Sequence, residues 1–155
     1  VLEYYQTTNQ SGPMHGLDFS EVKKTGGADD YYNNDWYPGW VHWGMSMANP
    51  LIASPIYNKD GDMTFKYNRV RAMHLGWSGD ISSEWTYLAK LSYNKTWGTP
   101  FKPIPDILEN FSTFASIIYT PRKWKGWRFN ASIAFDTGEI YGDNLGCQLK
   151  VRKIF

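Results

Sequence analysis

Residues 145–155 read Leu-Gly-Cys-Gln-Leu-Lys-Val-Arg-Lys-Ile-Phe, and this stretch decides the fold. Apolar side chains recur at every second position, and polar or charged side chains stand between them. A period of two with one apolar and one charged face is typical of a β-strand. The apolar face consists of Leu145, Cys147, Leu149, Val151 and Phe155, and the opposite face of Gln148, Lys150 and Arg152. Lys153 falls on the apolar face, near enough to the strand end for its long side chain to reach a polar boundary.

A strand that ends in an aromatic residue resembles the closing strand of bacterial outer-membrane β-barrels. Leu149, Val151 and Phe155 carry this resemblance. In such a barrel the apolar face contacts lipid. The resemblance therefore implies outer-membrane lipid and the barrel-assembly machinery as partners, with the loops exposed at the cell surface.

Other segments of the chain also favour strands. They are residues 1–8, 69–79, 85–95, 111–120 and 127–137. The alternation is cleanest in 127–137, whereas in 69–79 it is interrupted, which predicts a bulge or contact with a plug. The sequence therefore predicts an all-β chain, an antiparallel meander of about six strands. Residues 1–155 are one domain segment, in which 9–68 form a long external or lumenal loop region.

The predicted connections alternate in length. Residues 80–84 and 121–126 form short turns, whereas 9–68, 96–110 and 138–144 are mostly longer. Outer-membrane barrels have short periplasmic turns and longer external loops, so with Phe155 at the periplasmic side each length matches its side. This orientation places two sets of aromatic residues at the two membrane interfaces. The periplasmic set is Trp77, Trp85, Tyr119, Trp127 and Phe155, and the outer set is Tyr93, Trp97, Phe135 and Tyr141.

About six strands are fewer than the eight of the smallest common bacterial barrels. Open sheet edges cannot face hydrocarbon. We therefore expect the missing N-terminal barrel strands, or other membrane chains, to complete the barrel; a soluble sandwich needs no completion. Residues 1–5 do not resemble a signal peptide, which predicts a processed form or a fragment.

Composition fits these alternatives. The net charge is +1 with 20% charged residues, so bulk charge gives no argument for nucleic acid. Aromatic residues make up 17%, including 8 Trp and 11 Tyr, as expected for interfacial girdles or a sugar-binding surface. No apolar run is long enough for a transmembrane helix. The single Cys147 excludes an internal disulfide and a multi-cysteine metal site.

The long segment is rich in aromatic, amide and carboxylate side chains. Sugars present apolar C–H faces and a rim of hydroxyls, which aromatic platforms with adjacent polar groups fit well. Packing of a plug inside the lumen is an equal alternative, and for Trp97 a structural turn at Gly98 and Pro100 is favoured. The glycan-binding candidates are Tyr31, Tyr32, Trp36, Trp40, Trp43 and Trp97.

Basic residues gather on the predicted lumenal face. They are Lys90, Arg128, Lys150 and Arg152, with Arg69 and Arg71 as further members. Such a face suits an acidic polysaccharide, because arginine pairs with carboxylates in a bidentate fork. Salt-bridge ladders with acidic side chains on neighbouring strands or on a plug are the favoured alternative.

Catalysis has little support. Asp29 and Asp30 are adjacent, which is not the spacing of a glycosidase pair, and the three histidines lack metal-ligand spacing. Residues 58–62 resemble part of a calcium loop without its closing acidic ligand, which favours a turn. We expect no enzyme activity, cofactor or metal.

Several motifs together resemble the capsule-assembly Wzi-like outer-membrane proteins, the Bacteroides-type members above all. They are the runs 29–34, 39–44, 49–58, 68–76, 96–100 and 141–146, with 2–5 and 10–13. The resemblance covers nearly all of this chain but only the C-terminal third or so of such proteins. It implies a barrel of about eighteen strands and a non-catalytic, lectin-like role in anchoring capsular or exopolysaccharide. A pore component completed by other chains and a soluble carbohydrate-binding module are the alternatives.

Overall fold

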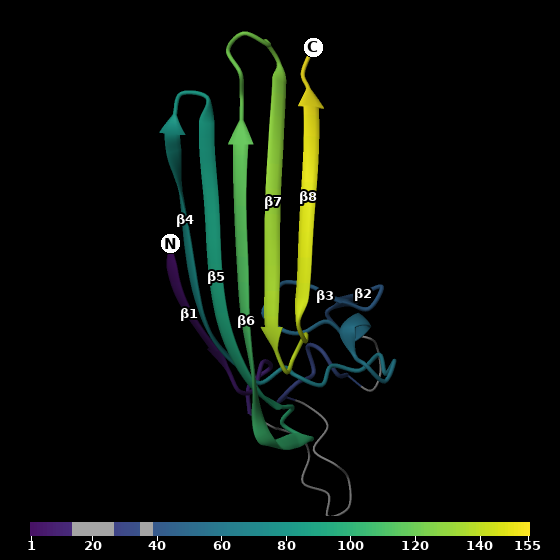
Figure 1. The fold of residues 1–155 in the computed structure, drawn as a ribbon. Helices are drawn as coiled ribbons and strands as arrows, with labels where there is room; N and C mark the ends of the chain where they lie inside the picture. Colours follow the sequence, from purple (N-terminus) through teal and green to yellow (C-terminus); the bar gives the residue numbers. More distant parts are fainter. Residues whose placement is uncertain (14–26, 35–38) are drawn as a thin grey trace, which may run out of the picture. The chain divides into compact units, whose positions relative to one another are not determined.

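The computed structural model describes residues 1–13, 27–34 and 39–155, and this part of the chain contains no α-helix. Its main feature is a six-stranded antiparallel sheet with the order β1-β4-β5-β6-β7-β8 (Figure 1). The strands are β1 (Leu2–Thr7), β4 (Val70–Ser82), β5 (Trp85–Gly98), β6 (Pro103–Tyr119), β7 (Trp127–Gly138) and β8 (Asn144–Lys153). The prediction of an all-β meander is confirmed.

The sheet begins with a long-range pair. Val1 and Gly76 exchange both backbone hydrogen bonds, at 2.7 and 2.9 Å, although they are 75 positions apart. Two residues that exchange both bonds mark an antiparallel pair. β1 therefore lies beside β4, and residues 8–69 form an excursion between neighbouring strands (Figure 1).

Small elements lie within this excursion. A two-stranded hairpin consists of β2 (Val41–His42) and β3 (Met45–Ser46), and a single 3-10 turn, η1, spans Pro55–Tyr57. The chain divides into two compact units, of which one comprises Val1–Tyr4, Met73–Tyr93 and Glu109–Phe155, and the other Tyr5–Ala72 and Asn94–Leu108.

The predicted long loop 96–110 is wrong. β5 continues to Gly98 and β6 already begins at Pro103, so only residues 99–102 connect them. Pro103 and Pro105 suggested a loop because proline interrupts a central strand. The pairing of β6 with β7, however, starts only at Asn110↔Gly138. Residues 103–109 therefore extend past β7 as an edge, where a missing N–H on the open side removes no ladder bond.

The predicted alternation of connection lengths fails with it. The other links along the meander are residues 83–84, 120–126 and 139–143. The short turn was expected at 121–126, yet the observed link 120–126 is longer than 99–102, the link observed where the long loop 96–110 was expected. Beyond the excursion 8–69, loop length therefore gives no support for a periplasmic and an external side.

The sheet has two chemically distinct faces. The register pairs Phe135 with Leu145 and Ala131 with Leu149 on one face, and Ser132 with Gln148 on the other. Side-chain contacts extend the polar face to the earlier strands, through His74 Nδ1 to Ser92 Oγ at 2.5 Å and Thr86 Oγ1 to Asp80 Oδ1 at 3.0 Å. The apolar face is exposed, and its side chains include Met73, Leu75, Trp77, Trp85, Phe111, Ile117, Ile133, Phe135, Leu145, Leu149 and Val151.

The buried hydrophobic core lies in the excursion and the start of β4. It consists of Tyr32, Ile52, Phe65, Val70 and Ala72, with Tyr5, Val41 and Leu51 packed against it. Val70 and Ala72 are each 2% exposed. The interrupted alternation of 69–79 therefore reflects packing of these two side chains against the folded excursion.

Among the described strands, both edges of the sheet are open. There β1 pairs only with β4 and β8 only with β7, and every residue of β8 is exposed. The described strands therefore form an open sheet. In the described residues no helix is long and apolar enough to cross a membrane.

Candidate functional site

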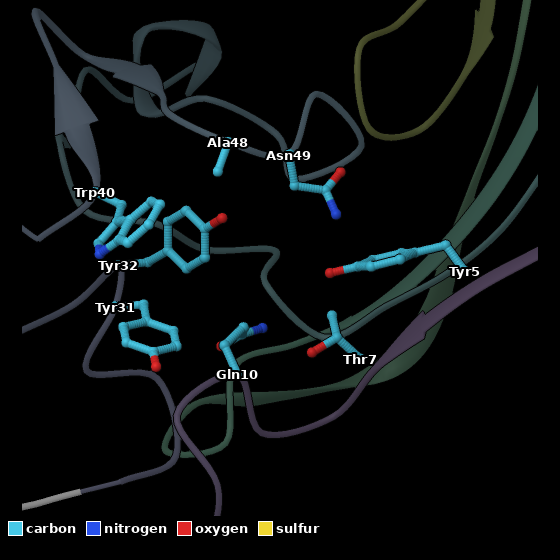
Figure 2. A pocket seen from close by; sticks show the side chains of 8 residues that line it. All are labelled: Tyr5, Thr7, Gln10, Tyr31, Tyr32, Trp40, Ala48 and Asn49. Atoms are coloured by element: carbon cyan, nitrogen blue, oxygen red, sulfur yellow. The ribbon is translucent and has the colours of Figure 1, made fainter.

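A pocket lined by aromatic side chains lies within the unit that contains Tyr5–Ala72 (Figure 2). Its volume is about 330 Å³. That is near the lower end of the range for small-molecule sites. The lining residues are Tyr5, Thr7, Gln10, Tyr31, Tyr32, Trp40, Ala48 and Asn49.

Tyr32 contributes the buried part of the wall. The backbone N–H groups of Tyr32 and Asn33 both donate to the Asp29 carbonyl at 2.9 Å, which closes a tight turn. The Asn33 amide then donates to the Phe65 carbonyl at 2.8 Å and accepts from the Phe65 N–H at 2.9 Å. The Tyr32 ring packs on the Phe65 ring with centroids 4.8 Å apart. The core thus fixes the position of this tyrosine.

Tyr31 and Trp40 form an exposed rim. Their ring centroids lie 5.8 Å apart at an interplanar angle of 54°, and about half of each side chain is exposed. The Trp40 N–H donates to the Tyr31 carbonyl at 2.5 Å. Gly39 permits this approach, because its φ is +67° and a Cβ there would lie 2.5 Å from the Tyr31 oxygen. Two rings can therefore face the same ligand from different segments.

Uncharged polar groups complete the wall. Figure 2 shows the Tyr5 hydroxyl projecting from β1 toward the other aromatic rings, with the Asn49 amide nearby. Asn49 Oδ1 accepts from the Leu51 N–H at 2.9 Å, which leaves its amide nitrogen as the donor. The Tyr32 hydroxyl donates to the Met47 carbonyl at 3.4 Å. Burial, with a smaller effect of Tyr5, raises the pKa of Tyr32, so this hydroxyl stays neutral at physiological pH.

Three of the predicted glycan candidates meet in the pocket, namely Tyr31, Tyr32 and Trp40. Trp43 instead lies at the tip of the β2–β3 hairpin, 86% exposed and with a φ of +50°. Trp97 lies within β5, where the guanidinium carbons of Arg69 and Arg71 are 5.4 and 5.9 Å from its ring centre. The prediction for Trp36 falls outside the described residues.

Asp29 and Asp30, the adjacent carboxylates of the long segment, form hydrogen bonds within the fold. Asp29 is 1% exposed, and its Oδ2 accepts from the amide nitrogens of Asn33 at 3.0 Å and Asn68 at 3.2 Å. Asp30 Oδ2 accepts from the Gly27 N–H at 2.9 Å. The polar groups of the pocket are instead Thr7, Gln10 and Asn49. Their separation along the chain gave no indication of a common site.

The basic candidates divide into two groups. Arg128 pairs with Arg152 across β7 and β8, and Lys150 pairs with Asn130, all on the polar face. By strand alternation Lys90 shares this face with Ser92. Arg69 and Arg71, in contrast, lie over Trp97 and not beside these residues. In the β7–β8 register the cross-strand partners of Arg128, Lys150 and Arg152 are therefore cationic or neutral.

Aromatic rings gather at one end of the apolar face. Trp85 stacks on Tyr119 with centroids 4.4 Å apart, and Phe129 lies 6.2 Å from Tyr119 and 6.1 Å from Trp127. Lys153 Nζ lies 5.1 Å from the Trp127 ring centre and donates to the Lys125 carbonyl at 2.9 Å. The exceptional lysine thus reaches polar groups at the strand end. Among the closing-strand residues, Leu149, Val151 and Phe155 are all exposed.

Metal-ligating side chains do not gather in the described residues. No group of three or more His, Cys, Asp or Glu there is placed to hold an ion. In residues 58–66 the carboxylates bind their own turn: Asp60 pairs with Lys66, and Asp62 Oδ1 accepts from the Thr64 N–H at 3.0 Å.

Comparison with protein-family models, with curated proteins and with solved structures found no match for this chain.

Proposed function

We propose that this chain is part of an outer-membrane β-barrel that holds polysaccharide at the cell surface without catalysis. The resemblance to Wzi-like proteins motivates the proposal. The lining of the aromatic pocket supports a sugar as the ligand. Trp40 and Tyr31 offer flat apolar surface, Tyr32 supplies a fixed wall, and neutral polar groups lie around them. Such a lining suits a sugar ring better than it suits a charged or purely apolar ligand.

The sheet supports the membrane location. Its apolar face is exposed along β4 to β8, and Leu149 alone is 85% exposed. A soluble carbohydrate-binding module would need a second layer over this face. The stacked aromatic group around Phe129, with Lys153 at its border, has the character of an interfacial girdle.

Two tryptophans of the same excursion provide the test. Trp40→Ala removes the rim of the pocket, whereas Trp43→Ala removes an equally large side chain from the hairpin tip, outside the pocket. Base stacking on aromatic side chains is worth about 1–3 kcal/mol per ring, and we expect a similar scale for a sugar, hence about a tenfold or greater loss of polysaccharide retention in Trp40→Ala. Trp43→Ala should retain it. Equal retention by both variants, with normal amounts of each in the outer membrane, would contradict the proposal.

A pore component completed by other chains is the second candidate. The observation that favours it is the cationic group Arg128, Lys150 and Arg152 on the polar face, with no acidic cross-strand neighbour in the β7–β8 register. Such a group would draw anions through a lumen. Anion-selective conductance of the native complex in planar bilayers, reduced in Lys150→Gln, would favour this candidate.

A further inference from the structure

We infer that the aromatic pocket selects neutral sugars and excludes acidic ones. The inference rests on the proposed function and names its ligand class: an uncharged pyranoside unit with an apolar C–H face. It departs from the role that the basic residues of the sheet would suggest, since those residues favour an acidic polysaccharide.

The lining carries the argument. Among the described residues the pocket wall contains four aromatic rings, an alanine and three uncharged polar side chains, and no Lys, Arg, Asp, Glu or His. A carboxylate that enters such a wall loses water without gaining a cation. A hydroxyl loses less, because hydroxyl and amide groups around the wall return a neutral hydrogen bond.

Four charged residues of the same unit contact partners outside the pocket lining. Asp29 Oδ2 accepts from the amides of Asn33 and Asn68, Asp30 Oδ2 accepts from the Gly27 N–H, and neither aspartate lines the pocket. Arg69 and Arg71 lie over Trp97. The Tyr32 hydroxyl donates to the Met47 carbonyl and remains protonated, so the buried part of the pocket wall is neutral as well.

The shape favours a single ring that is held on two sides. Tyr31 and Trp40 meet at 54°, so a pyranose can stack on one of them while the other contacts its edge. The Tyr5 hydroxyl and the Asn49 amide nitrogen lie across the space, where the hydroxyl rim of such a ring would meet them (Figure 2).

The test uses the full chain, purified from the outer membrane in detergent, and matched probes on one backbone. These are oligogalactose, oligogalacturonic acid and the methyl ester of the same oligogalacturonic acid, within an array of similarly paired neutral and acidic oligosaccharides. The methyl ester keeps the ring and removes the charge. We expect neutral and esterified members to bind, the matching acids to bind about tenfold or more weakly, and Trp40→Ala to abolish the difference.

A charge placed in the wall gives a second measurement. Thr7→Lys puts a cation at the pocket, so we expect the matching acids to gain affinity, while Lys123→Gln, at an exposed position of the 120–126 connection, leaves the preference unchanged. Pocket-dependent binding of acids as tight as that of neutral members would overturn the inference and leave the proposed function standing. Absence of binding to every probe by folded protein would contradict the proposed function itself, and the inference with it.

Discussion

Gly39 is the residue on which the geometry of the pocket most depends. The two rim rings approach because its φ is +67° and because no Cβ stands against the Tyr31 carbonyl. Gly61 offers a matched control, with a φ of +75° and no atom within 4 Å of its added Cβ. The two glycines therefore separate backbone strain from steric displacement of the rim.

We expect Gly39→Ala to weaken glycan binding at least as much as Trp40→Ala, because the Cβ forces the two rim segments apart. Gly61→Ala should cost only the strain of a left-handed residue, about 1–2 kcal/mol of folding free energy, and leave binding intact. Glycan affinity and urea unfolding of both variants measure the two effects. If Gly39→Ala bound as well as Gly61→Ala does, the close approach of Tyr31 and Trp40 would not matter for binding.

The turn at residues 58–66 contains three groups with shifted pKa values, Asp60, Asp62 and Lys66. The Lys66 hydrogen bond holds the pKa of Asp60 below its usual 3.8, and the Thr64 N–H holds that of Asp62 below 3.8. A carboxyl with a lowered folded pKa stabilises the turn above its unfolded pKa, and this contribution disappears as the pH falls through the folded pKa. The same bond raises the pKa of Lys66 above 10.5. Lys66 therefore stabilises the turn at pH values below 10.5, and this stabilisation is lost as the pH rises through the pKa of the folded state.

In Lys66→Met we therefore expect the pKa of Asp60 to return toward 3.8, while that of Asp62 stays low because its main partner is the Thr64 backbone. Carboxyl chemical shifts followed against pH by NMR give both values. A parallel rise of the two pKa values would mean that the whole turn had opened.

At the scale of elements, β8 allows a sharp test of the solvent on each face. Leu149 and Gln148 are adjacent and both exposed, yet they lie on opposite faces of the sheet. If lipid covers the apolar face, Leu149→Arg costs about 2–4 kcal/mol near the middle of a bilayer, whereas Gln148→Arg costs close to nothing. Urea unfolding of the outer-membrane protein in lipid vesicles measures both. Equal stability of the two variants would place water on both faces.

The elements also show what alternation could and could not predict. The long strands were expected where apolar and polar side chains alternate, most clearly in β7, whereas in β4 the alternation is interrupted at Val70 and Ala72. The ends of β5 and β6 were missed, because Pro103 and Pro105 are breakers only where both sides of a strand are paired. That condition depends on the register with β7, which a local pattern does not contain.

The same limit applies to the site. Tyr31, Tyr32 and Trp40 were found because a surface segment rich in aromatic rings is unusual in itself. Thr7, Gln10 and Asn49 were missed, since their polar side chains are ordinary in loops and join the pocket only through tertiary pairing. Trp43 and Trp97 were also candidates because they are aromatic residues in predicted loops. In the structure Trp43 lies at a hairpin tip and Trp97 beneath Arg69, and local sequence does not distinguish these positions from the pocket.

At the scale of the whole molecule, the open edges of β1 and β8 require further strands if the apolar face is to lie in hydrocarbon. We expect an antibody to this segment to detect, in unheated outer-membrane samples, a band several times heavier than 17.9 kDa that shifts on heating. The physical reason is that a closed barrel keeps its fold in detergent until heat opens the ladder. A band at 17.9 kDa in the soluble fraction would instead favour the soluble module.

The large sequence separation of Val1 and Gly76 bears on the order in which the described strands assemble. The strands from β4 to β8 join through short connections, whereas β1 must find β4 across the excursion of residues 8–69. Closing that longer loop costs about 3 kcal/mol more than closing a two-residue turn. The C-terminal hairpins are therefore expected to form before β1 docks on β4. Because Tyr5 and Thr7 arrive with β1, the pocket is complete only once β1 has paired with β4, and a molecule without this pairing has an incomplete ligand site.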